Sequence, residues 1–385
     1  MKLSTLTATL SLGAAASASS KYINYTTIPG YFIQDDASTD PSTFDYTSHN
    51  FGLLDRTYDA DKLATQTGSK NLTQWQRFHR QLEHLNEKAP KHVSYKLLFL
   101  GRHGEGWHNA AEDFYGTPAW NCYWSLLTGN STNSWVDAEL TPDGISQANI
   151  AHEYWLAQYK EQGIHFPDAY YSSPLTRSLK TANITFGGLP LKEAHAASFV
   201  PEVKEGFRES VSLHTCDHRR SKSYIKGLFP GWKFEKGLTE EDELWTGVKT
   251  ETSDGQDSRS RAALDDIFAA SVKLVKKPDG TCGAPASKDK DLVVSVTAHS
   301  GEIGSILRVI GHQKFRLSTG AVIPVLVRAE KVQEESESTS TVSWTASAHC
   351  TAPPVTSTAS GCVCASSATP VTSGFPIFAA TATPN

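Results

Sequence analysis

Residues 96–109 read KLLFLGRHGEGWHN, a short apolar run that passes directly into Gly, Arg and His. An uninterrupted run of Leu and Phe, without polar alternation, is typical of a strand buried on both faces of a parallel sheet. Residues 169–171 and 292–297 form similar runs of aromatic or β-branched side chains, and turn residues follow each of them. The three runs predict strands of one sheet.

Helix-like segments separate these runs. Residues 142–162 open with Pro-Asp-Gly and carry apolar side chains three to four positions apart, which predicts a helix. Residues 321–329 predict another strand, which Pro324 places at a sheet edge because proline cannot donate to the ladder. Alternating strands and helices predict an α/β fold, a three-layer α/β/α sandwich around a mostly parallel central sheet.

Polar and irregular segments mark the domain organisation. The sheet domain is predicted over 19–330, with residues 20–90 as an N-terminal extension and about 187–290 as an inserted cap region. Residues 331–385 are rich in Ser and Thr and poor in apolar side chains. Such a composition buries too little apolar area to offset the entropy of ordering, so we expect a disordered C-terminal tail.

Several features predict a secreted glycoprotein. Residues 1–18 start with a basic Lys2 and end in a small-residue Ala16-Ser17-Ala18 pattern, as signal peptides do, although a disordered N-terminus is the alternative. Four N-x-S/T acceptor sites follow, at Asn24, Asn71, Asn130 and Asn183.

The six cysteines are compatible with disulfides outside the cytosol, and their pairing stays open. They are Cys122, Cys216 and Cys282 in the body and Cys350, Cys362 and Cys364 in the tail.

Composition excludes several classes of partner. The formal net charge is −5, so no overall basic field favours nucleic acid or an anionic membrane. No apolar run reaches the roughly 18 residues of a membrane-spanning helix. His103 and His108 lack a third ligand at metal-binding spacing, so no metal is predicted.

The residues directly after the three apolar runs are those expected at a ligand site, because ligands of such sheets lie beyond the carboxyl ends of the strands. Arg102 and His103 follow the first run, Arg177 comes soon after the second, and His299 comes just after the third. Clustered Arg and His side chains without acidic partners are costly to bury, so the cluster predicts an anionic ligand.

A phosphoryl group suits this set. Arg102 and Arg177 provide forked, permanently charged donors, and neutral His103 provides a ring nitrogen that can attack phosphorus. Gly104 leaves room for the bend that exposes this ring. Asn109 and His299 can donate to phosphoryl oxygens and stabilise the charge of the transition state.

The stretch RHGEGWHNAAEDFYG (102–116) resembles the signature of the histidine phosphatase superfamily, in its phosphoglycerate mutase-like branch. Further matching blocks occur in family order within 135–148, 173–181 and 298–301. The segments IPGYFIQDD and FRESVSLHTCDHRRSKSYI are similar to a fungal subgroup of that branch, so the resemblance covers the whole chain between leader and tail.

The resemblance implies a role for each matched residue. His103 becomes the nucleophile, while Arg102, Arg177 and His299 bind the phosphate with help from Asn109. The proton donor of the family is a carboxyl group in the cap region, and Glu209 is the best match, with Glu205 and Glu202 as rivals. This role requires a raised pKa, hence partial desolvation. The family mechanism requires no metal or other cofactor.

Two departures bear on the substrate. The mutases have a small hydroxyl residue and an aromatic residue where this chain has Gly106 and His108. The phytase-like branch has an Asp proton donor after its second catalytic His, whereas Ser300 follows His299 here, which favours Glu209. Arg219, Arg220 and Lys222 suit recognition of a second anionic group of the substrate, and they equally suit a solvated turn.

These observations predict a secreted phosphomonoesterase that acts on a small phosphorylated molecule through a phosphohistidine, best at mildly acidic pH. A phosphomutase would use the same residues but hold its product for rephosphorylation. An inactive phosphate-binding relative is the remaining alternative.

Overall fold

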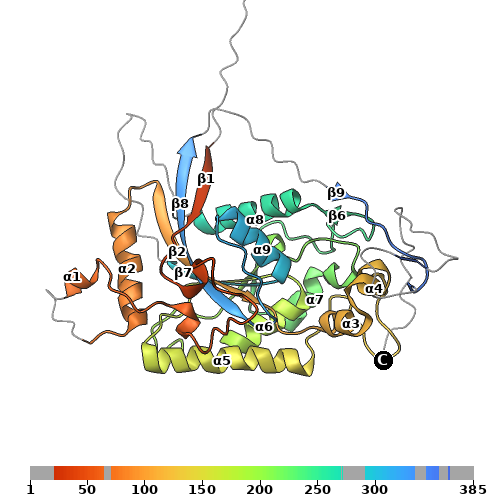
Figure 1. Cartoon of the computed structure of the whole chain (residues 1–385), viewed down its shortest axis with the longest axis horizontal. Coiled ribbons are helices and arrows are strands. Elements are labelled where there is room, and N and C mark those ends of the chain that lie inside the picture. The colour runs from red at the N-terminus through yellow and green to blue at the C-terminus, as the bar shows by residue number, and fades with distance from the viewer. Residues whose placement is uncertain are drawn as a thin grey trace, which may run out of the picture.

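A computed structural model describes residues 21–64, 71–269, 271, 291–333, 344–354 and 363–364. Within them, a seven-stranded sheet has the order β1-β8-β2-β7-β3-β4-β5. Figure 1 labels β1, β8, β2 and β7 of this sheet. Neighbouring strands are parallel from β2 to β5, and β8 is antiparallel to both β1 and β2. The predicted α/β fold with a mostly parallel sheet is therefore confirmed. The strands are β1 (Lys21–Thr27), β2 (Val93–Arg102), β3 (Ala169–Ser172), β4 (Glu202–Val203), β5 (Lys233–Phe234), β7 (Val293–Ala298) and β8 (Val322–Gln333).

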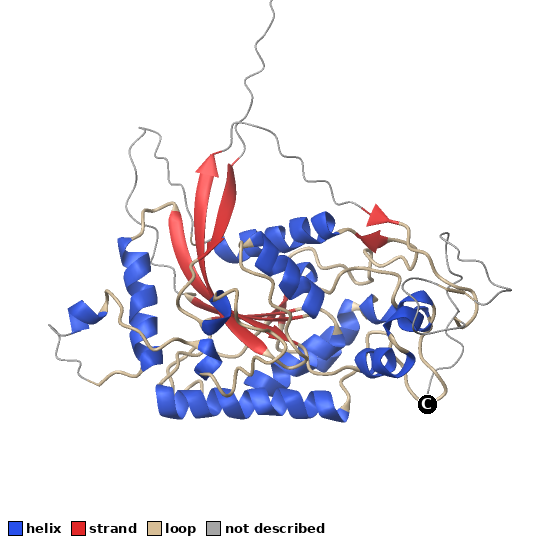
Figure 2. Cartoon of the chain, in the orientation of Figure 1, coloured by secondary structure: helices blue, strands red, loops and turns tan. Residues whose placement is uncertain are grey.

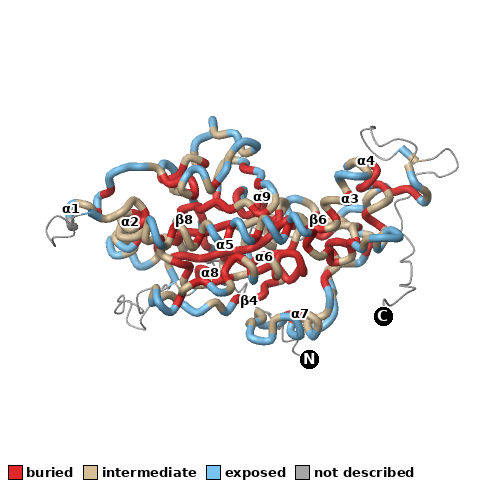
Figure 3. The backbone as a smooth tube through the Cα atoms, turned by 90° about the horizontal axis from the view of Figure 1, so that it is seen from below, coloured by how far each residue is buried: buried red, intermediate tan, exposed pale blue. Residues whose placement is uncertain are grey.

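Helices cover both faces of the sheet (Figure 2). In β2, Leu98 and Leu100 belong to the core formed with α8 (Ser253–Phe268) and α9 (Ser300–Val309). Leu97 and Phe99 point to the opposite core, formed with α2 (Gln74–Lys88) and α5 (Pro142–Gln162). Strand side chains alternate between faces, so β2 contributes to two cores and is buried on both sides. Figure 3 shows buried chain concentrated in the middle of the molecule.

The remaining helices are shorter. They are α1 (Asp61–Ala64), α3 (Trp107–Tyr115), α4 (Thr117–Cys122), α6 (Thr176–Phe186) and α7 (Lys222–Leu228), with 3-10 turns η1 (Ile33–Asp35), η2 (Asn50–Gly52), η3 (Trp124–Leu126), η4 (Glu205–Phe207) and η5 (Thr215–Asp217). The helix predicted over 142–162 is confirmed as α5. Among the described residues, no helix combines the length and apolarity needed to cross a bilayer.

The edge position predicted for the strand at 321–329 is wrong, because β8 lies between β1 and β2. The physical reason is that β8 is longer than its partner. β1 pairs only with Val327–Gln333, whereas Pro324 lies opposite Phe99 of β2, beyond the end of β1. On that unpaired side, the Pro324 carbonyl accepts a hydrogen bond from Gln34 at 3.0 Å. Proline thus marks a local edge within an interior strand.

Residues 20–90, predicted as an N-terminal extension of the sheet domain, contribute to the sheet and its core. β1 belongs to the sheet, and α2 packs against it. In β1 the side chains alternate, with Ile23 and Tyr25 buried and Tyr22 and Asn24 exposed. This two-residue period is the expected signature of a strand with one solvated face.

The region predicted as an inserted cap also contributes to the body. β4 and β5 extend the sheet, and α8 packs beside α9. Glu209, in the loop at 205–219, accepts hydrogen bonds from the first turn of α9, which follows β7. Residues 270 and 272–290 of this region lie outside the described residues. The limits of the cap stay a prediction.

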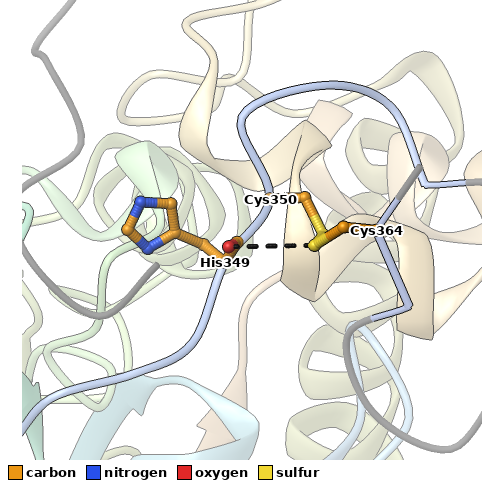
Figure 4. Close-up of a disulfide and its surroundings, with 3 residues drawn as sticks. All are labelled: His349, Cys350 and Cys364. Carbon is orange, nitrogen blue, oxygen red and sulfur yellow. Dashed lines mark hydrogen bonds between the residues drawn. A yellow bond between two sulfur atoms is a disulfide. The ribbon is translucent and has the colours of Figure 1, made fainter. Parts of the chain in front are cut away.

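The predicted disordered tail is wrong in part, because a strand pairing and a backbone hydrogen bond attach a described segment of it to the body. β9 (Trp344–Thr345) pairs with β6 (Thr250–Glu251), and Cys350 forms a disulfide with Cys364 (Figure 4). The Cys350 backbone N–H also donates to the Cys122 carbonyl at 2.9 Å, and Cys122 is itself disulfide-bonded. The rest of the tail and the predicted signal peptide at 1–18 lie outside the described residues.

Candidate active site

His103 lies immediately after β2, where its backbone N–H donates to the Ala298 carbonyl of β7 at 3.0 Å. Its ring Nδ1 is 2.6 Å from the Gly104 carbonyl. A carbonyl can only accept, so Nδ1 carries the proton and Nε2 keeps the lone pair. This is the tautomer that a nitrogen nucleophile requires.

Gly104 is required for a different reason from the one predicted. A Cβ at this position would lie 2.3 Å from the Gly144 carbonyl oxygen at the start of α5. The glycine therefore allows close contact between the His103 loop and α5, rather than an unusual backbone angle. Thr181 of α6 accepts from the Gly104 backbone N–H at 3.0 Å and holds the loop from the other side.

His299 follows β7 and faces His103, with ring centroids 5.0 Å apart. Its Nε2 lies 2.7 Å from the hydroxyl oxygen of Ser173 and 3.3 Å from that of Ser178. Its Nδ1 is buried without a hydrogen-bond partner among the described residues. The ring is therefore fixed at one nitrogen, and the other nitrogen remains for a ligand.

The two predicted phosphate-binding arginines are both anchored by carbonyl groups. Arg102 donates to Leu317 at 2.8 Å, and Arg177 donates to Cys216 at 2.6 Å. Arg177 also lies 3.5 Å from Asp217, measured between Nη2 and Oδ1. The Nε atoms of both arginines are buried without a partner among the described residues. Each guanidinium is thus oriented by the protein while retaining donors for an anion.

The electrostatics keep the imidazoles neutral. Burial, followed by the charges of Arg177 and Arg102, holds the pKa of His103 well below its usual value. Burial and Arg177 lower the pKa of His299 in the same way. A neutral His103 is the form that can attack phosphorus.

Asn109 lies in the first turn of α3, and its Oδ1 accepts from the Gly106 backbone N–H at 3.0 Å. This contact caps the helix and fixes the loop. The predicted hydrogen bond from its amide NH₂ to phosphate stays a prediction.

Glu209 is held at the N-terminus of α9, beside His299. Its carboxylate accepts from the backbone N–H groups of Ser210 at 2.9 Å and of Gly301 and Glu302 at 3.1 Å each. Burial and the nearby Asp217 raise its pKa, and the hydrogen bonds from Ser210 and Gly301 oppose that rise. The net upward shift is what a proton donor near neutral pH requires.

The two rival carboxylates are engaged elsewhere. Glu205 accepts from Arg208 and from Arg219 at 2.8 Å each. Glu202 pairs with Lys204 at 3.0 Å. Both carboxylates are thus occupied by basic side chains away from His299. The contacts therefore favour Glu209.

A buried polar network supports the Glu209 loop from behind. Arg259 of α8 donates to the carbonyls of Gly206, Arg208 and Glu209 at 2.8 to 3.3 Å. It also contacts Glu251 at 2.9 Å and Glu302 at 3.2 Å. The Arg259 guanidinium therefore forms ion pairs with two carboxylates. Burial nevertheless raises the pKa of Glu302 to about 8.

The basic residues predicted to meet a second anionic group have structural contacts instead. Arg219 is buried and donates to Glu205 and to the carbonyls of Thr239, Glu240 and Glu241. Lys222 donates to the Leu238 carbonyl at 3.1 Å. Arg220 lies over the ring of Tyr224, 4.6 Å from its centroid. These contacts within the protein account for the presence of the three basic side chains without a bound substrate.

Sequence reasoning missed Asp217, which is buried beside Arg177 and accepts from Ser212 at 2.6 Å. Ligand atoms of His214, Cys216 and Asp217 lie within 4.8 Å of one another, close enough to hold a metal ion. However, Asp217 already contacts Arg177, whose fixed positive charge opposes a cation there. The HTCD run at 214–217 was the available signal, but only the fold brings it to Arg177.

Comparison with known proteins gives consistent results. A family model described as histidine phosphatase superfamily (branch 1) matches residues 98–270. A probable phosphoglycerate mutase of Arthroderma benhamiae is 46% identical over 308 residues, covering 80% of this chain and 85% of that protein. Phosphomutase-like protein 3 of Candida albicans is 34% identical over 307 residues, or 80% of each chain. Among solved structures, a mycobacterial glucosyl-3-phosphoglycerate phosphatase is 16% identical with a TM-score of 0.33, covering 63% of this chain and 100% of that one.

Proposed function

Because this chain belongs to the histidine phosphatase superfamily, whose enzymes are phosphatases or mutases, we propose that it hydrolyses phosphate monoesters through a phosphohistidine on His103. The observation that carries this proposal is the convergence of two arginines and two neutral imidazoles beside one protonatable carboxyl group. Arg102, Arg177, His103 and His299 come from three strand ends, and Glu209 adjoins His299.

The reaction has two steps. In the first step, Nε2 of His103 bonds to phosphorus, the bond to the ester oxygen breaks, and Glu209 gives its proton to the leaving alkoxide. In the second step, Glu209 takes a proton from water, whose oxygen attacks phosphorus and breaks the phosphorus–nitrogen bond. The Arg102 and Arg177 guanidiniums and His299 stabilise the equatorial oxygens in both steps.

A phosphomutase is the second candidate, and the names of the relatives favour it. The Arthroderma benhamiae relative is named a probable phosphoglycerate mutase. A mutase would depend on a bisphosphorylated primer and release little inorganic phosphate. The assay that separates the two candidates measures released phosphate with and without such a primer.

We also propose that the protein is secreted and glycosylated. Asn24, Asn71, Asn130 and Asn183, the four acceptor residues, are all exposed. The Cys350–Cys364 disulfide is of a kind that persists in oxidising compartments. Mass analysis of the material outside the cells tests leader removal and glycan attachment.

The test of the enzymatic proposal is His103→Ala with an aryl phosphate substrate. We expect no measurable turnover and no phosphorylated protein, because the variant lacks the attacking nitrogen. His92→Ala is the matched control, since His92 precedes the opposite end of β2 and should leave activity unchanged. Measurable turnover by His103→Ala would refute the assignment of His103 as the nucleophile.

Chelation tests the metal alternative. Activity should survive EDTA, because the proposed chemistry requires no metal. Loss that Zn²⁺ restores would instead assign a role to His214, Cys216 and Asp217.

A further inference from the structure

A third imidazole lies beside His103 and has no role in the mechanism above. His108 is the second residue of α3, is 8% exposed, and its ring centroid lies 5.4 Å from that of His103. Its Nδ1 is buried without a hydrogen-bond partner among the described residues. A buried polar atom left unpaired destabilises the fold, so packing alone does not explain a histidine at this position.

Gly106 is what allows this ring to lie there. A Cβ on Gly106 would approach Nδ1 of His108 to 2.7 Å and its Cε1 to 2.9 Å. Its φ of −104° is open to any residue, so backbone conformation does not require glycine. The loop cannot easily move away, since the Gly106 N–H donates to Asn109 and the Trp107 N–H donates to Glu139. The two positions at which the loop departs from the mutase-like motif are therefore sterically linked.

The charges around His108 favour an anion and a neutral ring. Burial lowers its pKa well below the usual value, and Arg177, His103, Arg102 and His214 lower it further. A neutral imidazole offers one N–H donor and one acceptor. Arg102 Nε, Arg177 Nε and His299 Nδ1 are likewise buried without partners among the described residues. A phosphoryl group, with its several acceptor oxygens, is the chemistry that would satisfy such a set of nitrogens.

We propose that His108 is a third imidazole of the phosphate site, which donates its ring N–H to a phosphoryl oxygen alongside His299. This inference rests on the proposed function and adds a contact to that same site. It also gives Gly106 a purpose, because its missing side chain makes room for the ring.

The test compares two substitutions of opposite character. His108→Phe keeps a ring but removes both nitrogens, whereas His108→Gln keeps an N–H donor in a smaller side chain. Loss of one such donor typically lowers turnover by roughly 10²- to 10³-fold, so we expect a loss of about that size in kcat/KM, together with weaker orthovanadate inhibition, for His108→Phe. His108→Gln should retain more of the orthovanadate inhibition and more of the kcat/KM of the parent chain. A packing role predicts the reverse: an active His108→Phe with an equal or higher Tm and a weaker Gln variant.

Gly106→Ala provides a readout that does not depend on folding of the Phe variant. In the parent chain, the added methyl group should displace His108 and weaken orthovanadate inhibition. In a His108→Ala background, it should add almost nothing, because the clashing ring is gone. Additive effects of the two changes would refute the steric link. His103→Ala, assayed in parallel, separates the two proposals: inactivity of this variant with full activity of His108→Phe overturns only the role of His108.

Discussion

Glu209 is the proposed proton donor, and its carboxyl group has the surroundings that this role requires. It is half-buried, has a raised pKa, and is aligned by three backbone N–H groups. Glu209→Gln should lower turnover of an alkyl phosphate by roughly 10²- to 10⁴-fold, the range for a lost general acid. An aryl phosphate should suffer far less, because its leaving group needs no proton. Steady-state assays of the parent and the variant measure the loss of turnover on the alkyl phosphate relative to the loss on the aryl phosphate.

Asp217→Asn is the informative companion to that variant, because Asp217 is a buried carboxyl group that contacts Arg177. It should affect both substrates alike, through the orientation of Arg177. An alkyl-selective loss in Asp217→Asn, with equal losses in Glu209→Gln, would transfer the acid role to Asp217.

The dependence of activity on pH follows from the same residues. His103 must be neutral to attack, and its lowered pKa keeps it neutral well below pH 6.5. Glu209 must be protonated to donate, and its raised pKa keeps it protonated above pH 4.5. For alkyl phosphates, kcat/KM should therefore peak at mildly acidic pH and fall as pH rises through the pKa of Glu209. In Glu209→Gln this basic limb should vanish. A basic limb that persists there would contradict the assignment.

At the scale of elements, the sequence predicted correctly those features that depend on the local pattern of a single strand or helix. The apolar run ending at Leu100 predicted β2, and the residues after three strands predicted the convergence of Arg102, His103 and His299. The sequence was misleading for features that depend on the pairing of segments far apart in the chain. Pro324 indicated an edge, because nothing local shows that β1 ends before it. Asp217 reaches Arg177 only through the path of the cap region, which no local pattern encodes.

The start of α9 supplies an element-scale test with a matched control. A Cβ on Gly301 would lie 2.3 Å from Oε1 of Glu209, whereas a Cβ on Gly304, one turn later, meets only Arg308 at 3.8 Å. Alanine is favoured over glycine in helices by about 1 kcal/mol, so Gly304→Ala should keep full activity and an equal or higher Tm. Gly301→Ala should displace the carboxylate and lower alkyl phosphate turnover by roughly 100-fold, as loss of an aligned general acid does.

Both variants should be compared on alkyl and aryl phosphates, with thermal unfolding as the check on folding. Equal activity of Gly301→Ala and Gly304→Ala would show that Glu209 does not act from the position where α9 holds it.

At the scale of the whole molecule, a segment near the C-terminus supports the site from a distance. β9 pairs with β6, where Trp344 lies opposite Glu251. Glu251 contacts Arg259 at 2.9 Å, and Arg259 donates to the carbonyl of Glu209. The hydrogen bond from the Cys350 backbone N–H to the Cys122 carbonyl holds the segment against the body, and the Cys350–Cys364 disulfide closes a loop within the tail. Two residues, Glu251 and Arg259, thus connect the tail to the loop that carries the proton donor.

A chain that ends at Gln333 tests this connection. It loses β9 and the disulfide, whose sequence separation is 14 residues. The shortened chain loses the pairing of β9 with β6 and the hydrogen bond from Cys350 to Cys122, so we expect its Tm to fall by several degrees. Because β6 loses its partner strand, turnover of alkyl phosphates should fall more than that of aryl phosphates. Cys350→Ser/Cys364→Ser keeps β9 and should lower the Tm while leaving the alkyl-to-aryl ratio closer to that of the parent. An unchanged Tm and ratio in the shortened chain would show that the tail does not support the site.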